Sequence, residues 1–235
     1  MNVWRFVIFL CMAFLISSPV GFSTWTMEGG DLSKINFPTG ELPYRLAMNP
    51  THSLIAEHEY CIRKVDEGVS LTGCSAEQGL VHWQSPADWD VKEAFFADLN
   101  LDQMPELVML VWRPFRSWPV DQFMPHGGRI DSFQDHNGKS CQVILVGLRG
   151  NEFVELWAGS ALADPLHSLR AADFDGDGLD ELAALEYSYD GNPYNASMVL
   201  WEWNGFGFSL VARQPGNYAT LLIMQNDPPL LLTIE

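Results

Sequence analysis

The hydrophobic pattern of the chain consists of short apolar runs separated by turn residues, with no convincing helical period. Glycine, proline, asparagine and aspartate bound most of these runs, which is typical of strands joined by tight turns. The strand-like runs cover residues 54–62, 69–74, 107–112, 141–148, 153–157, 182–185, 198–203, 206–212 and 230–234. The pattern predicts an all-β protein.

The runs recur as a repeated unit. A tryptophan-containing segment precedes two acidic loops by the same spacing, since Asp98 lies thirteen residues after Ser85 and Asp173 lies thirteen after Ser160. An apolar run follows each loop, and a truncated third copy starts near Asp227. The predicted units cover about residues 80–155, 156–212 and 213–235, with an insertion over 113–135 in the first.

Each unit holds about four strand signals, and repeated four-stranded antiparallel units are typical of propeller blades. We therefore expect four-stranded antiparallel blade-like repeats over 53–235 that form a partial or small β-propeller. Because two or three units are too few to close a ring, a sandwich-like stack or completion by another chain remain alternatives. Residues 53–82 could add a degenerate blade. Residues 24–52 lack periodicity, which predicts an irregular lead-in or tether.

The best-preserved loop is Asp173-Phe174-Asp175-Gly176-Asp177-Gly178-Leu179-Asp180-Glu181. It places carboxylates at positions 1, 3, 5 and 9 of a tight turn, where they converge on one point and repel each other when bare. Ca²⁺ takes six to eight oxygen ligands in flexible geometry, so the spacing favours a calcium site. A solvated acidic turn without metal is the alternative. An EF-hand is excluded, because loop position 12 is Ala184.

This loop, followed by an apolar strand and recurring once per unit, resembles the FG-GAP/VCBS repeat of integrin-α-type β-propellers and exported bacterial proteins. The resemblance implies calcium bound by side chains at four positions and by one backbone carbonyl in each loop. Its first copy departs from the family at Leu101 and Gln103, where glycine is usual. The implied ligands are Asp173, Asp175, Asp177, Leu179 (carbonyl) and Glu181, and Asp98, Asn100, Asp102, Met104 (carbonyl) and Glu106.

Composition and charge limit the classes of partner and the cellular location that the sequence allows. The formal net charge of −17 argues against nucleic acid and against anionic membrane surfaces as partners. Residues 1–23 hold one charge, an apolar core and a small-x-small pattern, which predicts a cleaved export signal, with an uncleaved anchor as the alternative. In an oxidising compartment Cys61 and Cys74 could bridge a hairpin, and Cys141 is expected to be buried.

The insertion over 113–135 combines arginines with aromatic residues, which are enriched in binding hot spots. It is either a contact surface for a partner or a flap that covers an open blade edge. A zinc site of His126, Asp131 and His136 is disfavoured, because the spacing matches no common motif. The candidate contact residues are Arg113, Phe115, Arg116, Trp118 and Arg129.

No nucleophile elbow, metalloprotease motif or phosphate-binding glycine loop occurs in the sequence. The sequence therefore favours an exported, calcium-binding, non-catalytic protein that binds a protein or a surface polysaccharide. An enzyme or enzyme accessory module acting on cell-surface glycans, with an unrecognised pair of acids, is the alternative. A piece that completes the propeller of another protein is a third.

Overall fold

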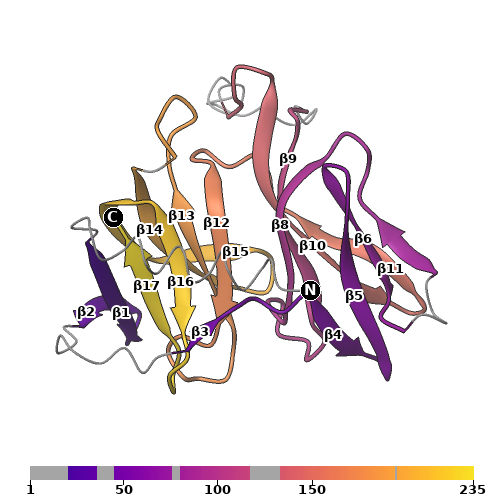
Figure 1. The fold of residues 1–235 in the computed structure, drawn as a ribbon, viewed down its shortest axis with the longest axis horizontal. Coiled ribbons are helices and arrows are strands. Elements are labelled where there is room, and N and C mark those ends of the chain that lie inside the picture. Colours follow the sequence, from indigo (N-terminus) through magenta and orange to yellow (C-terminus); the bar gives the residue numbers. More distant parts are fainter. Residues whose placement is uncertain (1–20, 36–44, 76–79, 117–132, 194) are drawn as a thin grey trace, which may run out of the picture.

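Four antiparallel sheets make up the computed structural model, which describes residues 21–35, 45–75, 80–116, 133–193 and 195–235. All regular elements in this part of the chain are β-strands, and none of its segments is a helix able to cross a membrane. The sheets stand side by side as blades of a four-bladed β-propeller (Figure 1). The predicted fold class is confirmed.

The blades follow the chain order, except that the last is shared between the two chain ends. Blade 1 contains β4 (His52–Ile55), β5 (His58–Val65), β6 (Gly68–Gly73) and β7 (Val81–Gln84). Blade 2 contains β8 (Asp90–Ala97), β9 (Glu106–Pro114), β10 (Lys139–Arg149) and β11 (Glu152–Ala158). Blade 3 contains β12 (Leu166–Ala172), β13 (Glu181–Glu186), β14 (Ala196–Trp203) and β15 (Phe208–Tyr218). Blade 4 contains β16 (Thr220–Met224), β17 (Leu230–Ile234), β1 (Phe22–Glu28), β2 (Asp31–Ile35) and β3 (Leu46–Ala47).

Continuous apolar runs form strands that are buried on both faces. Along β9, Leu107 and Met109 point into the core shared with blade 1, whereas Val108 and Leu110 point into the core shared with blade 3. Side chains alternate between the two faces of a strand, so a strand between two neighbouring blades needs apolar residues at every position. β13 repeats this arrangement between blades 2 and 4.

The chain closes blade 4 with its own N-terminal strands. β1 pairs antiparallel with β17, with Phe22 opposite Ile234 and Trp25 opposite Leu231. The expected irregular lead-in over 24–52 is therefore wrong, because most of β1 and all of β2 and β3 lie in this range and belong to the sheet. The truncated third unit is also explained, since its missing strands come from the opposite end of the sequence.

The predicted signal segment overlaps this closure. Phe22 and Ser23 are paired in β1, so a cleavage after Ser23 would remove two residues from the strand. Residues 1–20 lie outside the described residues.

Residues 45–50 lead from blade 4 to blade 1 across the inner strands. Arg45 O accepts a hydrogen bond from Gln225 N, and the Asn49 side chain donates to Leu169 O (3.0 Å). Pro50 O then accepts from Phe96 N (2.8 Å). The segment thereby links blades 4, 3 and 2 before it enters blade 1. In the described part of the chain, apolar clusters fill the 1/2, 2/3 and 3/4 interfaces only.

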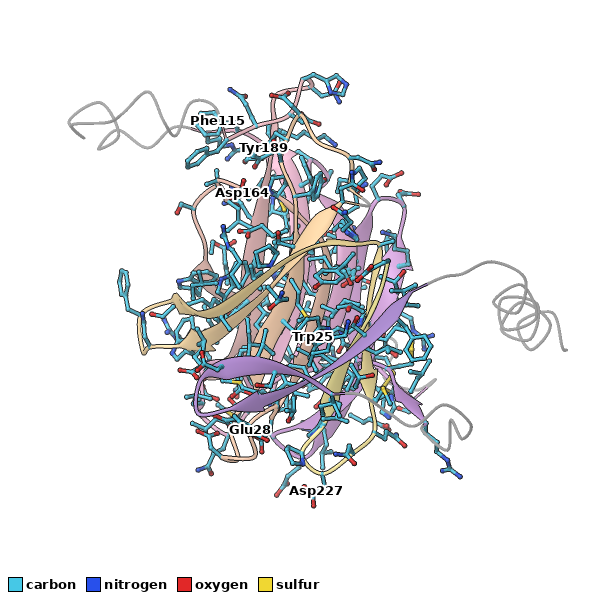
Figure 2. All side chains as sticks on the ribbon, turned by 90° about the vertical axis from the view of Figure 1, so that its left-hand side faces the viewer. Trp25, Glu28, Phe115, Asp164, Tyr189 and Asp227 are labelled. Atoms are coloured by element: carbon cyan, nitrogen blue, oxygen red, sulfur yellow. A yellow bond between two sulfur atoms is a disulfide. The ribbon has the colours of Figure 1, made fainter. Side chains whose placement is uncertain are left out.

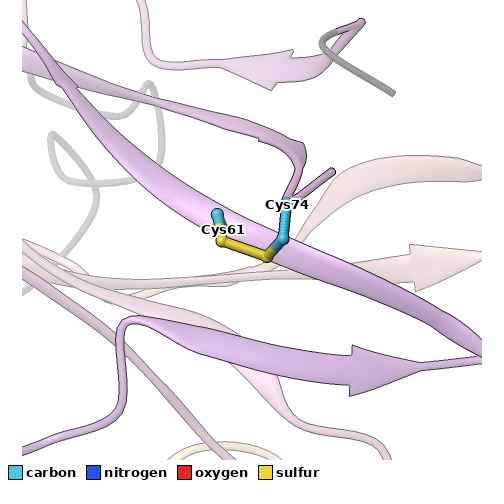
Figure 3. The surroundings of a disulfide bond; sticks show 2 residues. All are labelled: Cys61 and Cys74. Carbon is cyan, nitrogen blue, oxygen red and sulfur yellow. A yellow bond between two sulfur atoms is a disulfide. The ribbon is translucent and has the colours of Figure 1, made fainter. Parts of the chain in front are cut away.

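Blade 1 confirms that residues 53–82 contribute a further blade. A disulfide joins Cys61 of β5 to Cys74, just beyond β6 (Figure 3). It closes the hairpin whose turn includes Asp66 and Glu67. Cys141 is a buried free thiol, as expected.

Candidate metal-binding loops

Both acidic loops occupy the same place in their blades, between the first and the second strand. The first loop, Asp98–Glu106, joins β8 to β9, and the second loop, Asp173–Glu181, joins β12 to β13. In blade 4 the corresponding turn carries Asp227, at the end of the molecule opposite Phe115 (Figure 2). A Cβ atom on Gly176 would lie 3.7 Å from Pro228, so the second loop and the Asp227 turn are neighbours.

Asp173 closes the second loop. Its Oδ1 accepts a hydrogen bond from Gly176 N (2.7 Å), and its Oδ2 accepts from Gly178 N (2.9 Å). Both glycines have positive φ angles, +79° and +92°, in the region that glycine adopts without a steric penalty. The two glycines thus let the backbone fold around a single carboxylate.

The remaining acids of the second loop point inward over this turn. Asp175 Oδ1 accepts from Asp177 N (3.1 Å), and Asp177 Oδ1 accepts from Leu179 N (2.9 Å). Glu181, at the start of β13, accepts from Phe174 N (2.7 Å). One oxygen of each carboxylate lies within 4.8 Å of the others, which is a spacing that a single cation can bridge; the four carboxylates are Asp173, Asp175, Asp177 and Glu181.

The first loop repeats most of this hydrogen-bond pattern, except that Asp98 Oδ1 accepts from Asp102 N at position 5, whereas Asp173 Oδ1 accepts from Gly176 N at position 4. Asp98 Oδ2 accepts from Gln103 N (2.8 Å), which corresponds to the bond from Gly178 in the second loop. Glu106 Oε2 accepts from Leu99 N (3.0 Å), as Glu181 does from Phe174. The oxygens of Asp98, Asp102 and Glu106 also lie within 4.8 Å of one another.

The departures from the family pattern do not change the backbone path. Leu101 and Gln103 take φ angles of +67° and +68°, in the left-handed region that glycine occupies in the second loop. A residue other than glycine costs of order 1 kcal/mol there. The first loop therefore adopts the same fold at a higher energetic cost.

Asn100 makes the two loops chemically different. Its side-chain amide donates to Glu106 Oε1 (2.8 Å) and to Asp102 Oδ2 (3.3 Å). The equivalent residue in the second loop is Asp175, which brings another negative charge. At this position the first loop therefore has a neutral hydrogen-bond donor, and the second loop has a further carboxylate.

The two glutamates are the buried acids of the loops. Burial is the main reason that the pKa values of Glu106 and Glu181 are raised to about 8. The charges of the nearby aspartates act in the same direction, and the backbone hydrogen bonds that the glutamates accept act against it. Without a cation, burial and the neighbouring carboxylates therefore disfavour the charged form of both glutamates.

Asp180 is a candidate functional residue of the acidic loops that was not predicted from the sequence. Burial raises its pKa, and the charges of Asp98 and Asp173 raise it further, whereas a backbone hydrogen bond from Asp98 lowers it. Asp180, at position 8 of the second loop, therefore faces Asp98 of the first loop. Its position next to Glu181 was the only available signal. Leu179 and Met104 are 42% and 39% exposed. Their side chains offer no oxygen, so any contribution to an ion would come from the backbone carbonyl, as the resemblance implies.

The insertion lies at the other end of β9. The Arg113 guanidinium stacks over Trp89 at 5.3 Å, and burial lowers its pKa. Arg116 is exposed and pairs with Asp88 at 3.1 Å, and Phe115 N donates to Gly138 O. Trp118 and Arg129 lie outside the described residues, as do His126 and Asp131 of the disfavoured zinc site.

A cleft of about 310 Å³ opens between blades 2 and 3 beside the first loop. Asn100 and Asp102 line it, together with Arg149, Trp157 and Trp203. Asp102 is the one carboxyl among its described lining residues.

Comparisons with protein-family models, with curated proteins and with solved structures found no match to the chain. Its class is therefore defined by the fold, which is that of a four-bladed β-propeller repeat protein. Two of its four blades carry an acidic loop between the first two strands.

Proposed function

We propose that the protein is an exported, calcium-stabilised β-propeller of the FG-GAP/VCBS type that binds a protein or a surface polysaccharide without catalysing a reaction. The observation that carries this proposal is the hydrogen-bond pattern shared by the two acidic loops. Two different sequences hold their carboxylates in the same convergent arrangement, at the same place in adjacent blades.

The donor set suits calcium. Carboxylate, amide and carbonyl oxygens are the hard ligands that Ca²⁺ prefers, and neither loop offers nitrogen or sulfur from histidine or cysteine. In the second loop the carboxylates of Asp173, Asp175, Asp177 and Glu181 would hold the ion. The ion would neutralise them and tie the end of β12 to the start of β13, which is a structural role.

Export is supported by the Cys61–Cys74 disulfide, because such bonds persist in oxidising compartments. The single charge and the apolar core of residues 1–23 also support export. A binding role is favoured over catalysis because the described cleft between blades 2 and 3 holds only one carboxyl group, whereas glycoside cleavage needs a facing pair.

Thermal unfolding with calcium and with excess chelator tests the calcium role. Calcium at 100 times its Kd adds about 2.7 kcal/mol to the free energy of unfolding. For a chain of this length that raises Tm by roughly 5–10 °C, reversibly. Asp177→Asn should reduce the shift, whereas Asp190→Asn, an exposed aspartate outside the loops, should not. An identical Tm in calcium and chelator would overturn the proposal.

A pull-down from the native cell envelope tests partner binding. We expect Arg116→Ala and Trp118→Ala to weaken capture if the insertion forms the contact surface. Unchanged capture by both variants would exclude the insertion as that surface.

A further inference from the structure

The cleft between blades 2 and 3 combines a fixed aromatic wall with a polar rim. Trp157 of β11 and Trp203 of β14 come from the two different blades and meet edge to face, 5.8 Å apart. Phe208 of β15 packs against both at 5.2 Å. These three rings lie on the buried core of the 2/3 interface, and the two tryptophans remain half-buried at the cleft. Their orientation is therefore set by packing before any ligand arrives.

Close packing also fixes the Trp157 ring from two sides. A Cβ atom on Gly159 would lie 2.8 Å from the Trp157 ring, and one on Gly207 would lie 3.5 Å from it. A side chain at either glycine would collide with or press on the ring. Because Trp157 and Trp203 both line the cleft, aromatic surface is present there for the polarised C–H groups of a ligand.

The polar rim comes from residues outside the core. Arg149, at the end of β10, is exposed, and within the described part of the chain its guanidinium has no ion pair or hydrogen bond. Asp102 and Asn100 of the first loop face the same cleft. The Asn100 and Asp102 oxygens each accept a hydrogen bond within the loop and keep a second lone pair. The rim therefore places guanidinium donors next to carboxylate and amide acceptors, which matches hydroxyl groups because each can donate and accept.

We propose that this cleft binds a neutral sugar ring of a saccharide, with the ring against Trp157 and Trp203 and its hydroxyls toward Arg149 and Asp102. The inference rests on the proposed binding function and names its ligand class and its place. A volume of about 310 Å³ lies at the small end of ligand pockets, which suits one or two sugar rings better than a folded partner. The acidic loops and the net charge of −17 disfavour phosphorylated or acidic ligands.

Saturation-transfer NMR with four neutral probes tests the proposal: the methyl glycosides of glucose, galactose, mannose and N-acetylglucosamine, all in calcium buffer. We expect saturation transfer to at least one of them. Arg149→Ala should weaken that binding about tenfold, through loss of a charged hydrogen-bond donor. Trp203→Phe, which keeps an aromatic ring in the cluster, should weaken it less.

Arg63→Ala serves as the matched control, because it removes an exposed arginine of β5 in blade 1 that does not line the cleft. Saturation transfer to none of the four glycosides would overturn the proposal. Equal binding by wild type and Arg149→Ala, or loss of binding in Arg63→Ala, would also overturn it. A calcium-dependent Tm without glycoside binding would leave the calcium role intact, and glycoside binding without a calcium effect on Tm would refute only that role.

Discussion

The first and second acidic loops reach one geometry by different means. The second loop uses Gly176 and Gly178 where the backbone turns left-handed, whereas the first uses Leu101 and Gln103. In the first loop the neutral Asn100 amide donates hydrogen bonds to two carboxylates, whereas the second loop presents a fourth carboxylate, Asp175, in its place. The two loops show that different residues can follow the same backbone path within equivalent blades, and under the proposed calcium role their side chains would set how strongly each loop depends on the ion.

Replacement of the buried residue at loop position 2 by alanine should cause the largest loss in the free energy of unfolding. Phe174 lies in the 3/4 core and Leu99 in the 2/3 core, and both are buried. Phe174→Ala should lower the free energy of unfolding by about 3–5 kcal/mol, and Leu99→Ala by about 2–5 kcal/mol. Urea unfolding measures both. The exposed Leu179→Ala is the control, and an equally large loss in that variant would contradict the anchoring role of position 2.

Exchange of the residue at loop position 3 should reverse the difference in charge. Asn100→Asp should raise the calcium affinity of the first loop about tenfold, and Asp175→Asn should lower that of the second about tenfold. The physical reason is that the carboxylate count governs calcium affinity. Isothermal titration resolves the two sites. Unchanged affinities in both variants would show that position 3 does not contact the ion.

Substitution at the loop positions with left-handed backbone should change the free energy of unfolding the least. Gly178→Ala should destabilise the protein by about 1 kcal/mol, because alanine is strained at a φ angle of +92°. Gln103→Gly should stabilise it by about 0.5 kcal/mol, since relief of strain exceeds the added chain entropy. Urea unfolding measures both variants. A stabilising Gly178→Ala would mean that the loop does not hold this conformation in solution.

Much of the fold follows from local sequence. The apolar runs gave the strands of blades 2 and 3, and the repeated spacing before Asp98 and Asp173 located equivalent loops. The loop residues were predictable because all of them lie within nine positions of each other, where turn chemistry decides which side chains meet.

The closure of the ring could not be predicted in the same way. β1 and β2 contain several polar residues and are joined by a glycine turn, and β17, the partner of β1, lies about two hundred residues away in sequence. The hydrogen bond from Trp25 Nε1 to Thr233 (2.9 Å) depends entirely on this distant pairing. The cleft was missed for the same reason, since Asn100, Arg149 and Trp203 meet only when blades 2 and 3 pack together.

The most direct test of the account is a crystal structure of the protein grown with calcium, with anomalous diffraction used to locate the ion. We predict an anomalous peak in the second loop, about 2.3–2.6 Å from oxygens of Asp173, Asp175, Asp177 and Glu181. Asp175→Asn should weaken the peak. A well-ordered Asp173–Glu181 loop with no peak between its carboxylates would contradict the central claim.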